Sequence, residues 1–348
     1  KLPAKVIIPL IQHLGKPVQA VVKPGDLVKT GQLIGALEDK SIYSPVHSSL
    51  SGKVVAIDEL AHPGLGRARA VVIGSDGLDQ KIDFKAHPQE VIEQLPPHDI
   101  RKLIFDAGVV GMGGAGFPTH IKLTPPKPVD SFILNGAECE PYLTCDERLM
   151  IEKTREIVLG IGLALKCLGV KQAYIAIEDN KPEAIKAFEK AGRTTGYEIR
   201  ILKSGYPQGG ERQLIKAVLG REVAPGKYPF DVGAVVNNAA TVYAMYEAVY
   251  LGKPLYERVI TISGDCLENP GNYLARIGTS IQDLINECGP LKKEPERIVF
   301  GGPMMGLAQY SLETPVIKTT SGALFLSEKE AQSAQDAFCL RCGRCVEA

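Results

Sequence analysis

The chain has 348 residues, of which 45% are hydrophobic, so it can fold as two or three units that each bury a core. Its 40 basic and 40 acidic residues leave no net charge, which argues against nucleic acid or an anionic membrane surface as its partner. The longest apolar run, residues 157–165, is far shorter than the roughly 20 residues of a membrane-spanning helix. The composition therefore excludes a chain that crosses the membrane.

Residues 1–82 lack helical periodicity and contain short Val- and Ile-rich runs separated by Gly and Pro, which predicts an all-β unit. Segments 22–40 and 44–59 each place a turn before a strand, as in the two halves of a biotinyl- or lipoyl-type barrel-sandwich hybrid. We assign residues 1–86 to this domain and interpret it as a docking module. Lys40 lies where lipoyl carriers attach their cofactor, but Ser41 replaces the expected alanine, so we interpret Lys40 as a plain surface lysine.

The pattern of apolar residues changes after a polar, proline-containing segment at residues 87–100, which we interpret as a linker. Strands then alternate with helices, which predicts βαβ units on a mostly parallel sheet, here a Rossmann-like domain at residues 95–252. Ligands of such sheets bind outside the carboxyl ends of the strands. The predicted strands and helices are, in chain order, 131–135, 145–168, 173–177, 182–191, 197–202 and 211–219.

A third unit, residues 253–328, has the size of a β-grasp (SLBB) domain. Strands are predicted at 258–263, 272–277 and 297–300, with a helix between the last two that Thr279 or Ser280 can cap. The strand at 297–300 leads into the turn GGPMMG. Residues 329–348 are expected to begin a ferredoxin-like module.

Four glycines fall within GMGGAGFP, residues 111–118. Three of them fit the pattern G-x-G-x-x-G, but TPPKP at 124–128 would end a helix that begins at Pro118 within two turns, which excludes an ordinary Rossmann loop. The remaining interpretation is a concavity with outward-facing amides that a flat or phosphorylated ligand can approach closely. A glycine-rich surface loop is the alternative.

Three further segments carry polar or glycine residues where predicted strands end: NGAECEP (135–141), YPQGGERQL (206–214) and VVNNAATVYAM (235–245). Each segment alone has an ordinary structural explanation, because Asn and Gly cap helices and Glu favours helix N-termini. Together with the glycine turn, they are expected to converge on one crevice.

Cys339, Cys342 and Cys345 form the pattern C-x2-C-x2-C, which is typical of thiolate ligands to an iron-sulfur cluster in a reducing compartment. A fourth cysteine would fall at position 349, after the chain ends, so the ligand set is expected to be incomplete here. Zinc is the competing ligand, but zinc sites usually pair two C-x2-C motifs, and the sequence has no second one.

In this order, GMGGAGFPT with Lys122, NGAECEP, YPQGGERQL and NNAAT resemble the flavin- and NADH-binding segments of the flavin subunit of respiratory complex I. Together with the barrel, GGPMMG and CLRCGRC, the whole chain resembles RnfC, a subunit of Rnf-type electron-transport complexes. The resemblance implies an FMN site made by Gly111, Gly113, Gly114, Gly116, Lys122, Asn135, Asn237, Asn238 and Thr241. It implies a nicotinamide site lined by Glu138, Glu140, Tyr206, Gly209 and Glu211.

The chain departs from the complex I pattern at three positions. Met112 stands where that pattern has Arg, Ala137 where it has Asp, and Gly210 where it has the first Glu of a pair. A charged phosphate contact and a carboxylate contact to the ribityl chain are therefore not expected at Met112 and Ala137.

The resemblance implies a peripheral subunit on the cytoplasmic face of a membrane-bound, ion-translocating ferredoxin:NAD oxidoreductase. It would exchange hydride between NAD(H) and FMN, and single electrons with two 4Fe-4S clusters, without a catalytic acid or base. Its partners would be the other subunits, a ferredoxin-like electron carrier subunit and NADH, and no nucleic acid. Two alternatives remain: a cobalamin reductase of propanediol utilisation, in which the barrel comes last, and a non-catalytic scaffold that has lost its flavin.

Overall fold

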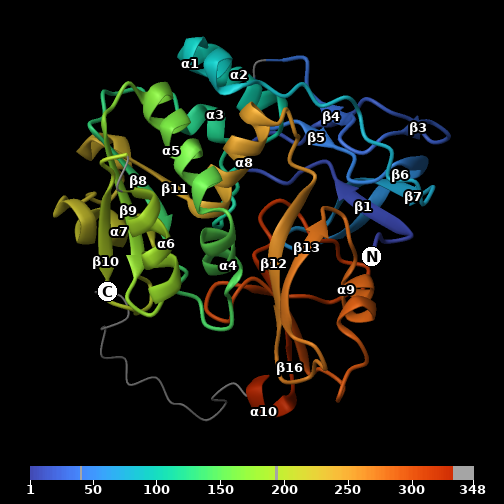
Figure 1. Cartoon of the computed structure of the whole chain (residues 1–348). Coiled ribbons are helices and arrows are strands. Elements are labelled where there is room, and N and C mark those ends of the chain that lie inside the picture. The colour runs from blue at the N-terminus through green and yellow to red at the C-terminus, as the bar shows by residue number, and fades with distance from the viewer. Residues whose placement is uncertain (40, 193–194, 332–348) are drawn as a thin grey trace.

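The computed structural model describes residues 1–39, 41–192 and 195–331 (Figure 1). The predictions for Lys40 and for Cys339, Cys342 and Cys345 lie outside these ranges. Three parts follow one another along the chain: a β-rich N-terminal part, a central α/β part and a second β-rich part. In Figure 1 the first lies at the upper right, the second at the left and the third at the lower right, below the first.

The N-terminal part is a barrel-sandwich of two small sheets around Val6, Ile8, Ile34, Val46 and Ile73, which are fully buried. The strands pair antiparallel, as alternating runs joined by Gly-containing turns predict. The first sheet has the order β1 (Lys5–Pro9), β7 (Gly66–Ser75), β6 (Gly52–His62), β3 (Leu27–Val28). The second has the order β2 (Gln19–Ala20), β4 (Leu33–Ala36), β5 (Val46–His47).

The segment interpreted as a linker is helical, and that interpretation was wrong. It forms α1 (Gln89–Gln94) and the first part of α2 (Pro97–Asp106). Pro97 is tolerated because it stands in the first turn of α2, where its missing N–H would have no partner within the helix. Ile100 and Ile104, one turn apart, are fully buried, and α2 packs against α5 and α8.

The central sheet is wholly parallel, as predicted, and has the order β10 (Glu198–Leu202), β9 (Gln172–Glu178), β8 (Ser131–Gly136), β11 (Ala234–Asn238). From β8 the chain first adds β9 and β10 on one side and then returns to add β11 on the other. The strand order therefore reverses between β8 and β11, and the carboxyl ends of these two strands mark the ligand-binding crevice of an open α/β sheet.

Helices cover both faces of this sheet. One face carries α5 (Thr154–Leu168), α8 (Ala239–Tyr250) and α6 (Pro182–Gly192), packed on Phe132 and Leu134. The other carries α7 (Glu211–Leu219), which packs on Ile133, and the short 3-10 helix η1 (Pro229–Val232). The alternation of β8 side chains between the two faces explains why its sequence is apolar throughout.

The single long helix predicted over residues 145–168 is two helices, α4 (Cys145–Glu152) and α5. They separate at Lys153, whose backbone (φ −123°, ψ 27°) leaves the helical region, and the Thr154 hydroxyl donates to the Met150 carbonyl (2.5 Å). The break lets α5 pack on α8 while α4 contacts β12 of the third part.

The third part is a five-stranded mixed sheet in which β12 and β16 run parallel and the other pairs antiparallel. It carries α9 (Ile281–Cys288), which Ser280 caps by accepting from the Asp283 amide (3.1 Å), as predicted, and the short α10 (Glu328–Ala331). The strand order is β13 (Gly271–Arg276), β12 (Glu257–Ser263), β16 (Gly322–Leu326), β14 (Arg297–Phe300), β15 (Leu307–Ala308).

The close packing of α5 on α8 gives a direct test of the central fold. A Cβ on Gly160 would lie 2.4 Å from the Val242 carbonyl oxygen, whereas a Cβ on Gly162 has Tyr197 Oη as its nearest neighbour at 3.7 Å. We expect Gly160→Ala to lower the free energy of unfolding by about 1–3 kcal/mol through overpacking. Gly162→Ala, on the same helix, should raise it by about 0.5–1 kcal/mol, because Ala restricts the unfolded chain. Urea unfolding followed by circular dichroism measures both; equal effects would contradict the packing.

Candidate functional site

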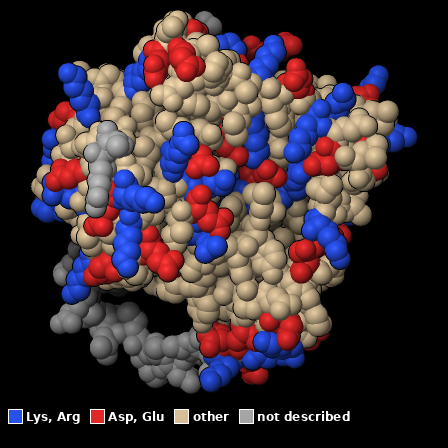
Figure 2. Space-filling model, viewed as in Figure 1, with Lys and Arg blue, Asp and Glu red and all other residues tan. Residues whose placement is uncertain are grey.

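A cavity of about 740 Å³ opens where the three parts meet. The central part contributes residues 112–115, the end of β8 with the loop after it, residues 206–210 and Asn238. The N-terminal part contributes loops 11–15 and 62–65, and the third part contributes residues 300–302, 305–307, 317 and 319–321. The cavity thus lies at the β8–β11 switch point, and all three parts build its walls. Acidic and basic side chains are interspersed over the face of the molecule that Figure 2 shows.

The glycine turn forms one wall. The Gly111 amide donates to the Phe117 carbonyl (2.9 Å), which closes the turn at its base, and α3 (Thr119–Lys122) follows as a single helical turn, as predicted. Gly113 and Gly114 are exposed towards the cavity. Gly114 has φ +144°, and a Cβ there would meet no atom within 4 Å. The turn therefore offers bare backbone and free space to a ligand.

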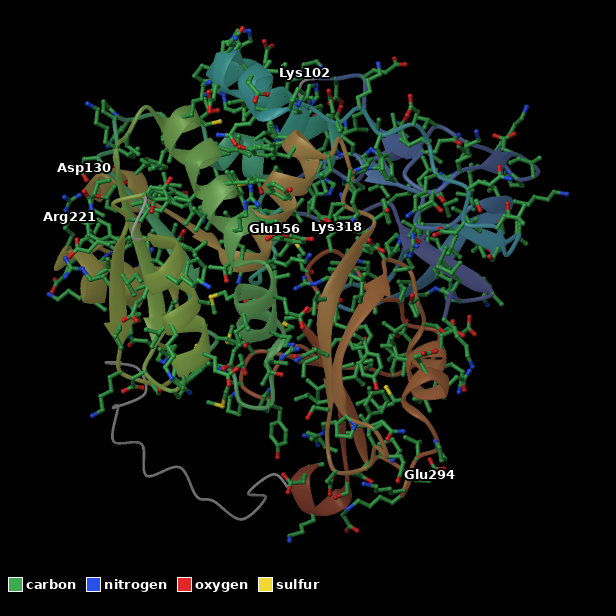
Figure 3. The ribbon with its side chains drawn as sticks, in the orientation of Figure 1. Lys102, Asp130, Glu156, Arg221, Glu294 and Lys318 are labelled. Atoms are coloured by element: carbon green, nitrogen blue, oxygen red, sulfur yellow. The ribbon has the colours of Figure 1, made fainter. Side chains whose placement is uncertain are left out.

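Two buried basic side chains of the third part support the start of this turn on the side away from the cavity. Lys318 Nζ donates to the Pro45 carbonyl (2.6 Å) and the Gly108 carbonyl (2.7 Å). Arg258 Nη1 donates to the Met112 carbonyl (3.3 Å) and the Lys318 carbonyl (2.5 Å). Lys318 lies in the interior between the three parts (Figure 3). Because these carbonyls accept hydrogen bonds from the two basic side chains, the segment before the turn is fixed in one position.

Asn238 joins the turn to two helices. Its Oδ1 accepts from the Ala240 and Thr241 amides, so it caps α8, and its Nδ2 donates to Asp146 Oδ2 at 2.5 Å. A Cβ on Gly113 would lie 3.0 Å from the Asn238 Cβ, so Gly113 lets the turn rest against this side chain. Asp146, in the first turn of α4, also lines the cavity, and burial raises its pKa.

Glu138 lines the cavity, and its side chain caps the N-terminus of α4 although Glu138 is not adjacent to this helix in the sequence. Its two carboxylate oxygens accept from the Asp146 amide (2.9 Å) and the Glu147 amide (3.1 Å), while the side chain of Thr144, the residue before the helix, does not cap it. Burial, and then the neighbouring Asp146 charge, raise the pKa of Glu138 to about 7. Lys181 Nζ lies 3.9 Å from Glu138 Oε2 and offsets part of this effect.

The turn at Tyr206 and Gly209 forms another part of the cavity wall. Asn135 Nδ2 donates to the Gly209 carbonyl (2.9 Å), and the Gly209 amide contacts Cys139 Sγ (3.3 Å). A Cβ on Gly209 would lie 2.4 Å from the Ala137 carbonyl oxygen, so a glycine is required for this approach. Burial raises the pKa of the Cys139 thiol, so it is not a poised nucleophile.

The structure brings together eight of the residues predicted to form the site, and they line the cavity: Gly113, Gly114, Asn135, Glu138, Glu140, Tyr206, Gly209 and Asn238. The other six lie behind it: Gly111, Gly116, Lys122, Glu211, Asn237 and Thr241.

The six residues behind the cavity have evident structural contacts. Lys122 Nζ pairs with Glu211 Oε1 at 2.6 Å, and Thr241 Oγ1 accepts from the Met112 amide at 2.8 Å. The Asn237 amide faces Met245 Sδ in the core. Gly116 (φ +65°) packs against Thr319 and the backbone of residues 12 and 13.

Sequence reasoning missed the walls that come from outside the central part. The N-terminal part was interpreted as a docking module, but its Gln12 and His13 line the cavity beside the glycine turn. Gln12 Oε1 accepts from the Lys318 amide (3.0 Å), which links the first part to the third. Asp146 was also missed, because Asn238, to which it is hydrogen-bonded, is distant from it in the sequence.

The site offers backbone amides, amide side chains and carboxylates around a space with one glycine-lined wall. This donor set fits a planar, phosphate-bearing ring: the open Cβ position at Gly114 leaves room for it, and Asn135 and Asn238 flank it. Ordinary dinucleotide binding on a long helix is excluded, because α3 has only 4 residues.

Comparison with known proteins first defines the class. A model described as the Nuo51 FMN-binding domain matches residues 104–247, one described as the RnfC barrel sandwich hybrid domain matches residues 1–78, and one described as the SLBB domain matches residues 259–308. The chain is thus an oxidoreductase subunit with an FMN-binding domain.

The relatives define the family. The chain is 47% identical to the C subunit of the proton-translocating ferredoxin:NAD(+) oxidoreductase complex of Clostridium ljungdahlii, with all of this chain and 76% of the relative covered. It is 45% identical to the C subunit of the Na(+)-translocating complex of Acetobacterium woodii, with coverages of 99% and 78%. The chain therefore belongs to the RnfC family, the C subunits of ion-translocating oxidoreductase complexes, and the family resemblance predicted from the motifs is confirmed.

A solved structure supports the fold alone. The NAD+-reducing [NiFe]-hydrogenase in the H2-reduced state matches 70% of this chain and 51% of its own chain, with a TM-score of 0.55 and 23% identity. With the domain matches, it confirms the predicted fold class of barrel-sandwich, Rossmann-like and β-grasp parts. No helix within the described residues is long and apolar enough to span a membrane.

The buried Lys318 predicts a pH dependence of stability. Burial lowers the pKa of Lys318 from 10.5 to about 7, so between these values the unfolded chain binds more protons than the folded chain. The free energy of unfolding should therefore gain from this group as the pH rises from 7 towards 10, by at most about 1.4 kcal/mol per pH unit. We expect Lys318→Met to lose this gain, measured by urea unfolding at several pH values. Lys102→Met, at an exposed lysine, should keep the wild-type slope; an unchanged slope in Lys318→Met would contradict the assignment.

Proposed function

We propose that the chain holds FMN non-covalently in the cavity and exchanges hydride with NAD(H) there. The observation that carries this proposal is the bare backbone at Gly113 and Gly114, which lies open beside Asn238 at the switch point of the parallel sheet. Such a turn presents amides to a phosphate and leaves room for a flat ring. The match of residues 104–247 to an FMN-binding domain supports the same ligand.

The residues proposed for FMN fall into two groups. Gly113, Gly114, Asn135 and Asn238 would contact it, because they line the cavity. Gly111, Gly116, Lys122, Asn237 and Thr241 would act from behind by shaping the turn and its supports. Thr241 illustrates this support, because it receives the Met112 amide and is itself fully buried.

The residues proposed for NAD(H) lie on the other side of the same space. Glu140, Tyr206 and Gly209 would line the nicotinamide, with Glu138 at the floor, and Glu211 would act through its pair with Lys122. When bound, FMN supplies the conversion between two-electron and one-electron transfer. The chain's own residues would place the two rings against each other and keep water out, and hydride transfer needs no protein acid or base.

By likeness to the ferredoxin:NAD(+) oxidoreductase relatives, we propose that single electrons pass to two 4Fe-4S clusters in the longer protein, with Cys339, Cys342 and Cys345 as ligands of the first. These cysteines lie outside the described residues. We further propose peripheral attachment to the cytoplasmic face of the membrane complex, with the other subunits, a ferredoxin-like carrier and NADH as partners.

The two alternative functions have less support than the proposed one. A cobalamin reductase would have its barrel last, whereas the barrel-sandwich model matches residues 1–78. A scaffold without flavin is suggested by Met112 and Ala137, but Asp146 places a carboxylate in the same cavity as Ala137, beside Asn238. The carboxylate missing at Ala137 thus has a substitute nearby.

An FMN titration tests the proposal. We expect the purified chain to bind FMN with quenching of flavin fluorescence, and anaerobic NADH then to bleach the flavin absorbance. Gly114→Val should weaken FMN binding at least 100-fold, because its side chain would fill the space that the ligand needs.

The matched control is Gly25→Val. Gly25 also has a positive φ (+100°) and free space around its Cβ position, but it lies in a turn of the N-terminal part away from the cavity. Gly25→Val introduces the same backbone strain but places no side chain in the cavity. The affinity for FMN should therefore stay within threefold of that of the parent chain. Absence of FMN uptake by the parent chain would favour the scaffold.

A further inference from the structure

The turn GGPMMG, residues 301–306, follows β14 and forms part of the cavity rim. Phe300, Gly301, Gly302 and Met305 line the cavity from the third part, as Gly113 and Gly114 do from the central part. Met304 and Met305 are exposed, at 54% and 74%. The residues proposed for FMN and NAD(H) include none from this turn.

The turn holds Glu140 at close range. The Met304 amide donates to Glu140 Oε2 (2.9 Å). A Cβ on Gly302 would lie 2.2 Å from the same oxygen and 2.5 Å from the Glu140 Cβ. Any side chain at position 302 would therefore displace Glu140, and the glycine is required for this contact rather than for its own backbone conformation.

The turn is itself fixed, so it can act as a support. The Gly301 amide donates to the Gly322 carbonyl (2.9 Å), which anchors the turn to β16, and the Gly306 amide donates to the Gly302 carbonyl (2.8 Å), which closes it. A Cβ on Gly306 would lie 2.3 Å from that carbonyl. The contact to Glu140 thus comes from a rigid element of a different sheet.

One carboxylate oxygen of Glu140 remains without a hydrogen bond. Oε1 is buried and has no partner among the described residues, although a buried carboxylate oxygen is costly to leave unpaired. Glu140 lies near Tyr206, since its charge contributes, after burial, to the raised pKa of the Tyr206 hydroxyl. Both residues line the cavity, so a donor on a bound ligand can supply the missing hydrogen bond.

We propose that the Gly301–Gly306 turn belongs to the nicotinamide dinucleotide site: Gly302 and the Met304 amide position Glu140 so that its free oxygen accepts from a hydroxyl or amide donor of the dinucleotide. Gly302 and Met304 are positioning residues, and Glu140 makes the contact. This inference rests on the proposed function, because it assigns the support of that same site to the third part.

Gly302→Ala tests the proposal in the FMN-loaded chain. We expect the dissociation constant of NAD+, measured by isothermal titration calorimetry, to rise at least tenfold while that of FMN stays within twofold. Gly271→Ala is the matched control, because Gly271 also belongs to the third part, does not line the cavity, and a Cβ there would have Tyr273 as its nearest neighbour at 3.6 Å. It should leave both constants unchanged.

A double-mutant cycle separates positioning from general disruption. If Gly302 acts through Glu140, Gly302→Ala should have little further effect on NAD+ binding in a Glu140→Gly background. Additive losses would overturn the proposal. Should Gly302→Ala fail to fold, Glu140→Gln replaces it, since it keeps an oxygen for the Met304 amide but changes the free oxygen to a nitrogen. It should weaken NAD+ binding at least tenfold with FMN affinity intact; unchanged NAD+ affinity would overturn the proposal.

The outcomes distinguish failure of the proposed function from failure of this inference. If the parent chain binds no FMN, the proposed function fails and this inference fails with it. If FMN and NAD+ bind but Gly302→Ala leaves NAD+ affinity unchanged, only the inference fails, and the turn is a structural contact between two parts of the chain.

Discussion

The site depends on two buried basic side chains that support the start of the glycine turn on the side away from the cavity. Lys318 and Arg258 both come from the third part, and they donate to the carbonyls of Gly108 and Met112. A buried polar group is costly unless its donors are satisfied, so these bonds fix the relative position of the two parts as well as the turn. Since Lys318 Nζ also donates to Pro45, the same side chain connects the N-terminal part. The cavity exists because the sheets of all three parts are held together at this point.

The departures from the complex I pattern have a consistent structural explanation. Met112 is 4% exposed and packs in the core of the central part, so a charge at this position would be buried. The positive charge near the turn comes instead from Arg258, which binds the Met112 carbonyl. Ala137 has no carboxylate, but Asp146 supplies one beside Asn238. The charges near the glycine turn thus come from residues that are distant from it in the sequence. A comparison of short motifs covers only residues that are close in the sequence.

Local patterns predicted the parallel sheet, the capped helix after Ser280 and the convergence of strand ends, because each depends on periodicity or on residues close in sequence. The sequence could not show that Gln12, Arg258, Lys318 and Gly302 support the site, since these contacts join segments that are far apart in the chain. The linker interpretation failed because Pro97 begins a helix instead of breaking one. The break at Lys153 was missed because residues 152–156 contain neither Gly nor Pro to signal it, and because it depends on the contact of α4 with β12 of the third part.

The central claim is that one cavity at the β8–β11 switch point holds a planar, phosphate-bearing ring against the glycine turn. A crystal structure of the chain grown with saturating FMN tests it most directly. The account predicts flavin density between Gly114 and Tyr206, with Asn135 and Asn238 within hydrogen-bond distance of the ligand. Flavin density outside this cavity, or an empty cavity at saturating FMN, would contradict it.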